Sequence, residues 1–74
     1  MRRAGSVVGT AQGLLVCRTD GADVDIGAMV LDDSLAEVGR VVDVFGPVEN
    51  PFFAVTPAED VHPPRLVGER LYER

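Results

Sequence analysis

The chain has 74 residues, of which 12 are acidic and seven are basic, and its formal net charge is −5. We expect one small domain over residues 1–74; a domain of this size buries only ~60–65% of its unfolded surface and gains stability from a partner. No apolar run reaches the length of about 18 residues that a membrane-spanning helix needs, and glycines break up the segment where a signal peptide would have its apolar core. A single cysteine excludes an internal disulfide and a multi-cysteine zinc site and favours a reducing, cytoplasmic location.

The charge pattern has a second feature, because all seven basic residues are arginine and lysine is absent. An acidic surface without lysine is typical of proteins that stay hydrated in a salt-rich cytoplasm, and it predicts a halophilic archaeal source. The same charge argues against direct binding of nucleic acid, which needs clustered basic residues to neutralise phosphates. The arginines are instead scattered along the chain at positions 2, 3, 18, 40, 65, 70 and 74.

The chain has almost no helical periodicity. Short apolar runs rich in β-branched residues alternate with glycine, proline and aspartate clusters, a pattern typical of a small β-barrel or β-sandwich. We predict six strands, at Gly5–Thr10, Gly13–Thr19, Ala28–Leu31, Glu37–Phe45, Phe52–Val55 and Glu69–Tyr72.

The connections between these strands have the composition of turns. Ala11–Gly13 is short enough for a hairpin, Thr19–Asp23 is a longer polar loop, and Asp32–Ser34 carries side chains that bond nearby backbone in turns. Asp33–Val38 is also compatible with one helical turn capped by Asp33 or Ser34.

Two further features concern the loops and the glycines. Thr56–Pro64 is a polar loop in which Pro63-Pro64 favours extended polyproline geometry and excludes a helix. Gly27, Gly39 and Gly68 each follow an apolar residue just before or inside a strand. Glycines so placed suit the bends and bulges of a tightly curved barrel, although chance similarity in a glycine- and valine-rich chain remains an alternative.

Candidate catalytic groups are sparse. His62 is the only histidine and stands in a proline-bearing loop, where a solvent-facing role is expected. Cys17 alternates with Leu15 on one face of an apolar strand, which favours a buried, inert thiol. Nothing in the sequence favours a Cys17–His62 pair of nucleophile and base, although the sequence alone leaves it open.

Paired carboxylates also occur, at Asp23/Asp25, Asp32/Asp33 and Glu59/Asp60. Acid–base work would require an apolar cleft that separates two pKa values, and a barrel this small fills its interior with side chains. We interpret the pairs as solvated surface. Asp20–Asp25 resembles a calcium loop only superficially, because it lacks the closing glutamate and the flanking helices of an EF-hand; weak cation binding there stays open. We therefore predict no enzymatic activity, no cofactor, no metal site and no small-molecule substrate.

The most distinctive stretch is Gly39–Val55. It begins as a valine-rich strand that ends on Phe45, and two breakers follow, Gly46-Pro47 and Asn50-Pro51. Phe52 and Phe53 come next, and because successive strand residues point to opposite faces, at most one of them can be in the core. Two stiff turns flanked by aromatic residues predict a fixed apolar surface.

This stretch resembles the Gar-one family, the small β-barrel proteins of H/ACA guide-RNA particles that make pseudouridine. The hallmark of that family reads roughly Gly-x-Val-x-x-Val-Phe-Gly-Pro-Val-x-x-Pro-Tyr/Phe, and Phe52 stands here where Tyr is common. The first hairpin and the last strand agree with the family as well, so the resemblance covers nearly the whole chain. The residues that fit the hallmark in order are Gly39, Val41, Val44, Phe45, Gly46, Pro47, Val48, Pro51 and Phe52.

The resemblance implies an all-β fold, a small closed six-stranded β-barrel of the translation elongation factor/reductase type. It also implies a non-catalytic subunit of an archaeal H/ACA particle, acting in rRNA processing and ribosome biogenesis. Its direct partner would be the catalytic domain of the pseudouridine synthase, and guide and substrate RNA would be reached through the particle. The subunit would aid substrate-RNA loading and product release. The contact surface that we predict consists of Phe45, Gly46, Pro47, Val48, Pro51 and Phe52.

One alternative function belongs to a different class. Phe45, Phe52 and Phe53 have the character of aromatic residues that stack single-stranded bases. A free-standing RNA- or tRNA-binding barrel of the translation-factor type would use them in this way, together with a basic groove. The acidic composition argues against such a groove.

Overall fold

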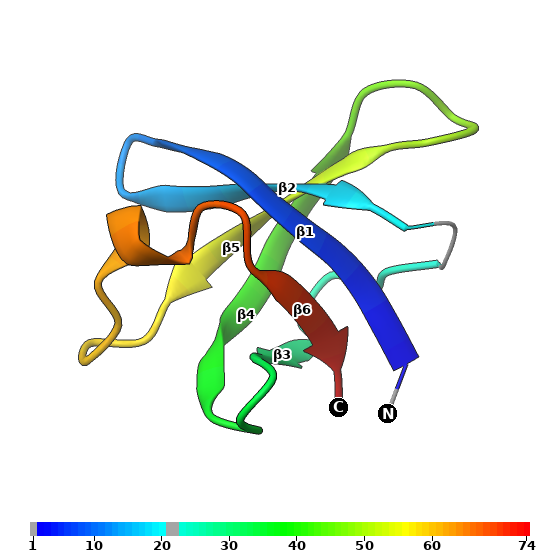
Figure 1. The fold of residues 1–74 in the computed structure, drawn as a ribbon. Helices are drawn as coiled ribbons and strands as arrows, with labels where there is room; N and C mark the ends of the chain where they lie inside the picture. The colour runs from blue at the N-terminus through cyan, green and yellow to red at the C-terminus, as the bar shows by residue number, and fades with distance from the viewer. Residues whose placement is uncertain (1, 21–22) are drawn as a thin grey trace.

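The computed structural model of the protein describes residues 2–20 and 23–74. Its strands form a closed antiparallel barrel in the order β1-β2-β5-β4-β3-β6, so the chain is all-β and the barrel, not the sandwich, is the architecture (Figure 1). The only helical element in the described residues is the short 3₁₀ helix η1. The elements are β1 (Arg2–Ala11), β2 (Leu14–Thr19), β3 (Met29–Leu31), β4 (Glu37–Phe45), β5 (Phe52–Pro57), η1 (Pro63–Leu66) and β6 (Arg70–Glu73).

All six predicted strands are present, and β4 has the predicted bounds. The largest difference is at β1, which starts at Arg2 and not at Gly5, because Arg2 and Arg3 pair with Glu73 and Tyr72 of β6. That pairing joins the two ends of the chain and closes the barrel, a long-range event that the local sequence does not reveal.

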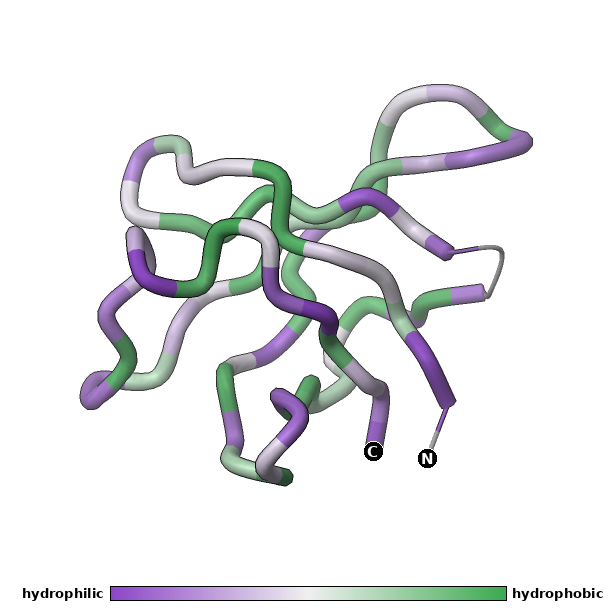
Figure 2. The backbone as a smooth tube through the Cα atoms, viewed as in Figure 1, coloured by the Kyte–Doolittle hydropathy of each residue, from purple (hydrophilic) through white to green (hydrophobic). Residues whose placement is uncertain are grey.

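The barrel interior is filled by one apolar cluster. Phe53 is the largest fully buried side chain, and each well-buried side chain of this kind stabilises the fold by ~1.5–3 kcal/mol. Figure 2 shows apolar stretches along the strands and also at some loop tips, and hydrophilic stretches near the two chain ends. The buried cluster comprises Ala4, Val7, Leu15, Cys17, Val30, Val38, Val41, Phe53, Val55 and Leu71.

Two glycines allow neighbouring strands to approach closely. A Cβ atom at Gly5 would collide with the carbonyl oxygen of Arg18, and one at Gly39 would collide with that of Thr56. The pairing of β1 with β6 also shifts register between Arg3 and Gly5. Of the three glycines interpreted as features of a curved barrel, Gly39 allows such a close approach, whereas Gly27 and Gly68 lie in turns at positive φ.

The β3–β4 turn corrects one alternative from the sequence. Residues 33–38 form no helical turn; the carboxylate of Asp32 accepts hydrogen bonds from the Ser34 amide at 2.9 Å, the Ser34 hydroxyl at 2.7 Å and the Ala36 amide at 3.0 Å. Asp32 therefore holds the turn, and neither Asp33 nor Ser34 caps a helix there. The Ser34 hydroxyl, followed by the two amides, holds the pKa of Asp32 below its usual value, because each donor stabilises the ionised form.

Pro63-Pro64 was predicted to be extended and not helical, and that prediction is wrong, because the pair begins the 3₁₀ helix Pro63–Leu66. This helix is η1, with His62 as the N-cap residue and the Arg65 amide donating to the His62 carbonyl at 3.0 Å. The first positions of a helix need no intrahelical N–H donor, and proline fixes a helical φ, so a proline pair is compatible with a helix start.

Candidate functional site

The β4–β5 hairpin carries the predicted contact residues. Phe45 ends β4 and Phe52 begins β5; the two residues pair across the strands, and their rings stack with centroids 5.9 Å apart and an interplanar angle of 22°. Because Val44 and Phe53 face the core, this aromatic pair lies on the outside of the barrel. Phe45 is 42% exposed.

Gly46 turns the chain beside that stack. Its φ is 90°, a conformation that L side chains rarely adopt, and a Cβ atom there would lie 3.0 Å from Cδ2 of Phe52. Glycine is therefore required both by the backbone and by the ring packed against it.

The remainder of the loop is tethered at its base and apolar at its tip. The amide of Thr19 at the end of β2 donates to the Pro51 carbonyl at 3.1 Å, and the Thr19 hydroxyl donates to the same oxygen at 2.8 Å. The Asn50 amide donates to the Pro47 carbonyl at 3.3 Å. Val48 stands 97% exposed between these turns, so the fold gains almost nothing from burying it.

Arg18 is a functional candidate that sequence reasoning missed. Its guanidinium carbon lies 5.3 Å from the centroid of the Phe52 ring, within cation–π range. Arg18 pairs with Phe52 across β2 and β5, so Arg18, Phe52 and Phe45 form one row on the outer face. The sequence indicates that Arg18 faces outward, next to the inward Cys17, but not which β5 residue it meets.

The apolar outer face extends beyond this row. Val16 pairs with Ala54 two residues along from Arg18 and Phe52, and both therefore share the outer face. Val42 lies at the irregularity where the β4–β5 register shifts and is itself exposed. The aromatic pair therefore continues into an aliphatic strip on β2, β5 and β4.

A pocket of about 370 Å³ lies on the other side of the loop, between the β4–β5 loop and the segment that follows β2. Figure 1 shows both segments at the same end of the barrel. The predicted residues thus divide: Phe45 and Phe52 face outward, whereas Val48 and Pro51 line the pocket.

The described residues offer little chemistry. Burial raises the pKa of the Cys17 thiol to about 12, so the thiol is un-ionised at neutral pH, as the inert interpretation predicts. His62 is exposed, as predicted, and the structure gives no hydrogen bond between it and Cys17 in the described part of the chain. Within residues 2–20 and 23–74, no group of three His, Cys, Asp or Glu side chains is arranged to hold a metal ion. Over the same residues, no helix is long and apolar enough to cross a membrane.

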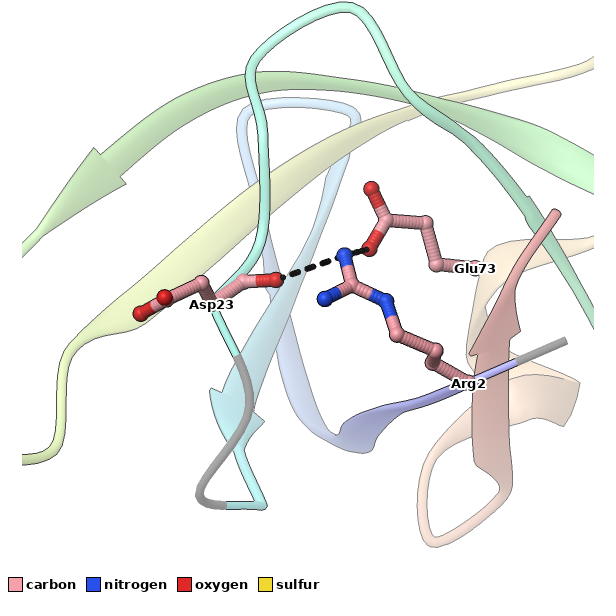
Figure 3. Close-up of polar contacts among 3 residues, drawn as sticks. All are labelled: Arg2, Asp23 and Glu73. Carbon is pink, nitrogen blue, oxygen red and sulfur yellow. Dashed lines mark hydrogen bonds and ion pairs between the residues drawn. The ribbon is translucent and has the colours of Figure 1, made fainter.

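Most arginines are engaged in contacts within the protein. Arg2 donates to the Glu73 carboxylate at 2.5 Å and to the Asp23 carbonyl at 3.1 Å, as Figure 3 shows. Two further ion pairs join Arg3 to Asp20 at 2.6 Å and Arg74 to Glu37 at 2.8 Å. Arg40 donates to the Gly27 carbonyl at 2.9 Å, and Arg18 lies over Phe52. The cations are therefore dispersed over the barrel and do not form a basic groove.

These features place the chain in the class of small closed β-barrels that present a rigid apolar hairpin. Residues 1–73 match the family model described as the Gar1/Naf1 RNA binding region. The chain belongs to this family, which confirms the resemblance found in the central motif. The family is one of non-catalytic ribonucleoprotein proteins, and membership supports a role as a component of an H/ACA ribonucleoprotein particle.

The chain is also similar to one curated protein and to one solved structure. An uncharacterised protein of Methanothermobacter thermautotrophicus is 33% identical over 64 residues, a match that spans 82% of this chain and 68% of that protein. The solved structure of the Gar1 domain of Naf1 superimposes with a TM-score of 0.73 over 99% of this chain and 81% of the other, at 15% identity. At that identity the structure supports the barrel fold alone.

Proposed function

We propose that this chain is a non-catalytic subunit of an H/ACA guide-RNA pseudouridylation particle that binds the pseudouridine synthase through its β4–β5 hairpin. The contact surface consists of Phe45, Gly46, Pro47, Val48, Pro51 and Phe52. The observation that carries the proposal is Val48, which is 97% exposed on a loop whose base is fixed by Thr19. A rigid loop that exposes an apolar tip suits a partner that buries it.

The hairpin has the properties of an interaction hot spot. Gly46 and the Thr19–Pro51 bonds hold its shape before binding, which lowers the entropic cost of association. The aromatic pair supplies large side chains, and binding energy in interfaces concentrates on such anchors. The strip through Val16 and Val42 enlarges the surface available to one partner.

The family model is described as an RNA binding region, which favours RNA contact, but the following features argue against a free-standing RNA-binding barrel. Phe45 and Phe52 stack on one another, so a base would have to use the outer face of the pair. Arg18 is the cation beside that pair, and a backbone-tracking groove requires several. With a net charge of −5, the surface repels phosphates at low salt.

The role in the particle that we propose rests on the family resemblance. A subunit that contacts the synthase without a catalytic group of its own acts by shifting the conformations of its partner. We propose that it favours loading of substrate RNA and release of product, and that guide and substrate RNA are reached only through the particle.

The test is binding of the purified chain to the pseudouridine synthase of its own organism, measured by calorimetry. Val48→Asp should abolish detectable binding without loss of folding, because the Val48 side chain is solvated in the free protein. Val67→Asp is the matched control, since Val67 is also exposed but lies after η1 and away from the hairpin. Equal affinity of the Val48 variant and the wild type would exclude this surface, and a gel shift with bare guide RNA tests the alternative directly.

A further inference from the structure

The pocket beside the hairpin is lined by two apolar residues of the proposed contact surface, Val48 and Pro51, and by two that lie outside that surface, Val24 and Val44. Val44, Val24 and Pro51 are partly buried, and Val44 and Val24 pack against the barrel core. Val48 completes this lining from the loop tip. The apolar part of the lining therefore consists of the partly buried Val24, Val44 and Pro51 and of the exposed Val48.

Of the four other lining residues, one is Thr19 and three are acidic. Asp23 and Asp25 lie on the segment after β2, Glu49 lies on the facing loop, and none of the pocket residues is basic. In the described part of the chain, the ion pairs involve other carboxylates and none of these three. Three like charges around one opening repel one another, and a cation placed among them relieves that repulsion.

A hydrogen bond from Arg2 fixes the backbone at Asp23, one of the three acidic residues. Arg2 binds the main-chain carbonyl of Asp23 and not its carboxylate. Figure 3 shows the Asp23 side chain pointing away from Arg2. Arg2 is itself fixed to Glu73 of β6, so the barrel end anchors the backbone and leaves the carboxylate available.

We propose that this pocket receives a basic side chain of the protein partner, an arginine or a lysine. Such a side chain has an aliphatic stem, which would lie on Val44, Val48 and Pro51, and a cationic head, which would reach Asp23, Asp25 and Glu49. The proposal rests on the proposed function for the identity of the partner, because Val48 belongs to both surfaces. It adds the chemistry that the partner must present: a basic residue beside the apolar patch that covers Phe45.

The charge of the pocket decides between this occupant and others. An RNA phosphate would meet three carboxylates and no cation from the lining residues. A second copy of this acidic chain would bring further like charge. Among the described residues, no three carboxylates or histidines gather as a metal ion would require.

The first experiment needs no synthase. The labelled protein is titrated with N-acetyl-arginine methylamide, and in parallel with the citrulline analogue, which has nearly the same shape and no charge. We expect saturable NMR shifts at the Val24 and Val48 amides with the arginine probe, several-fold larger than with citrulline. The variant Asp23→Asn/Asp25→Asn/Glu49→Gln should lose them.

The matched control is Asp33→Asn/Asp60→Asn/Glu59→Gln, which removes the same charge from exposed residues outside this pocket. It should keep the arginine-dependent shifts. Equal shifts with citrulline, or shifts that persist in the pocket variant, would overturn the proposal. If the triple variant fails to fold by circular dichroism, Glu49→Gln alone should still reduce the shifts.

The second experiment separates this proposal from the proposed function. At about 0.15 M potassium chloride, the pocket variant should bind the synthase about tenfold more weakly than wild type, and the control should change less than about twofold. The difference should narrow near 1 M salt as the charges are screened. If the wild type binds the synthase and the pocket variant binds it equally well, the basic side chain in the pocket is refuted and the proposed function stands. If the wild type does not bind the synthase but does bind the arginine probe in the pocket, the proposed function is refuted and the pocket proposal stands.

Discussion

The ring of Phe52 covers the backbone of Gly46. A Cβ atom on Gly46 would lie 3.0 Å from Cδ2 of Phe52, and φ at Gly46 is 90°. Phe52 is at the same time stacked on Phe45 and approached by Arg18. The glycine, the two rings and the guanidinium therefore form one packed unit, and a change in any of them alters the shape of the hairpin surface.

Gly46→Val tests whether this unit is the contact surface. A β-branched residue at positive φ costs ~1–2 kcal/mol, and its side chain would also displace Phe52. We expect the variant to lose binding to the synthase by calorimetry while circular dichroism still reports a β-barrel. Gly13→Val is the matched control, because Gly13 has a φ of 80° but nothing within 4 Å of a Cβ atom. It should lose stability and keep affinity; equal loss of affinity in both variants would contradict the assignment.

The adjacent residues Phe52 and Phe53 should separate binding from folding. Phe53 is fully buried, so Phe53→Ala should reduce the free energy of unfolding by about 3–5 kcal/mol in a urea titration. Phe52→Ala should cost much less stability, because the ring lies outside the barrel, and should reduce affinity for the synthase by tenfold or more. If Phe52→Ala destabilised the barrel as much as Phe53→Ala, the outer aromatic pair would be structural.

The hairpin could be read from the sequence because its signals are local. Glu37–Phe45 has continuous β-propensity, Gly46-Pro47 ends it, and alternation alone implies that Phe52 and Phe53 face opposite ways. The stack of Phe45 on Phe52 follows from a hairpin register that the two breakers constrain. These features depend on residues close together in the chain.

The other half of the candidate site depends on contacts between distant segments. Nothing local indicates that Arg18 meets Phe52, or that Asp23 and Asp25 face Glu49 across a pocket, because β2 and β5 pair only once the barrel closes. The extended prediction for Pro63-Pro64 failed for a different reason. There the tolerance of proline at a helix start outweighed its preference for extended geometry, and η1 forms.

Cys17 provides a stability test that is independent of function. Burial raises its pKa from 9.0 to about 12, so the folded protein keeps the thiol protonated where the unfolded chain ionises it. The contribution of the protonated thiol to the free energy of unfolding is fully present below pH 9. It is lost progressively as the pH rises toward 12, because the unfolded state then binds fewer protons than the folded state. Urea titrations of wild type and Cys17→Val between pH 8 and pH 11 should show a steeper decline for the wild type. If the free energy of unfolding declined equally with pH in both proteins, the pKa of the Cys17 thiol would not be raised by burial.

The last prediction concerns salt and separates a protein partner from an RNA partner. If the main contact is the apolar surface around Phe45 and Val48, the complex with the synthase should persist from about 0.15 M to molar potassium chloride. Apolar burial is strengthened when ions are excluded from the surface, and screening also removes repulsion among the 12 carboxylates. The single ion pair proposed for the pocket would weaken over this range of salt. This loss offsets only a small part of the gain in apolar burial.

A protein that held RNA through phosphates would behave in the opposite way. With six to ten phosphate contacts, affinity falls by roughly 10³–10⁵ between about 50 and 200 mM salt, because counterions are released on binding. Calorimetric titrations of the chain against the synthase and, separately, against guide RNA across this range give the dependence of each binding constant on salt concentration. Binding to bare RNA that is tight at low salt and falls log-linearly would favour the RNA-binding barrel. A complex with the synthase that is insensitive to salt but lost in the Val48→Asp variant would place the contact on the hairpin, because the substitution puts a charge where the partner would bury an apolar side chain.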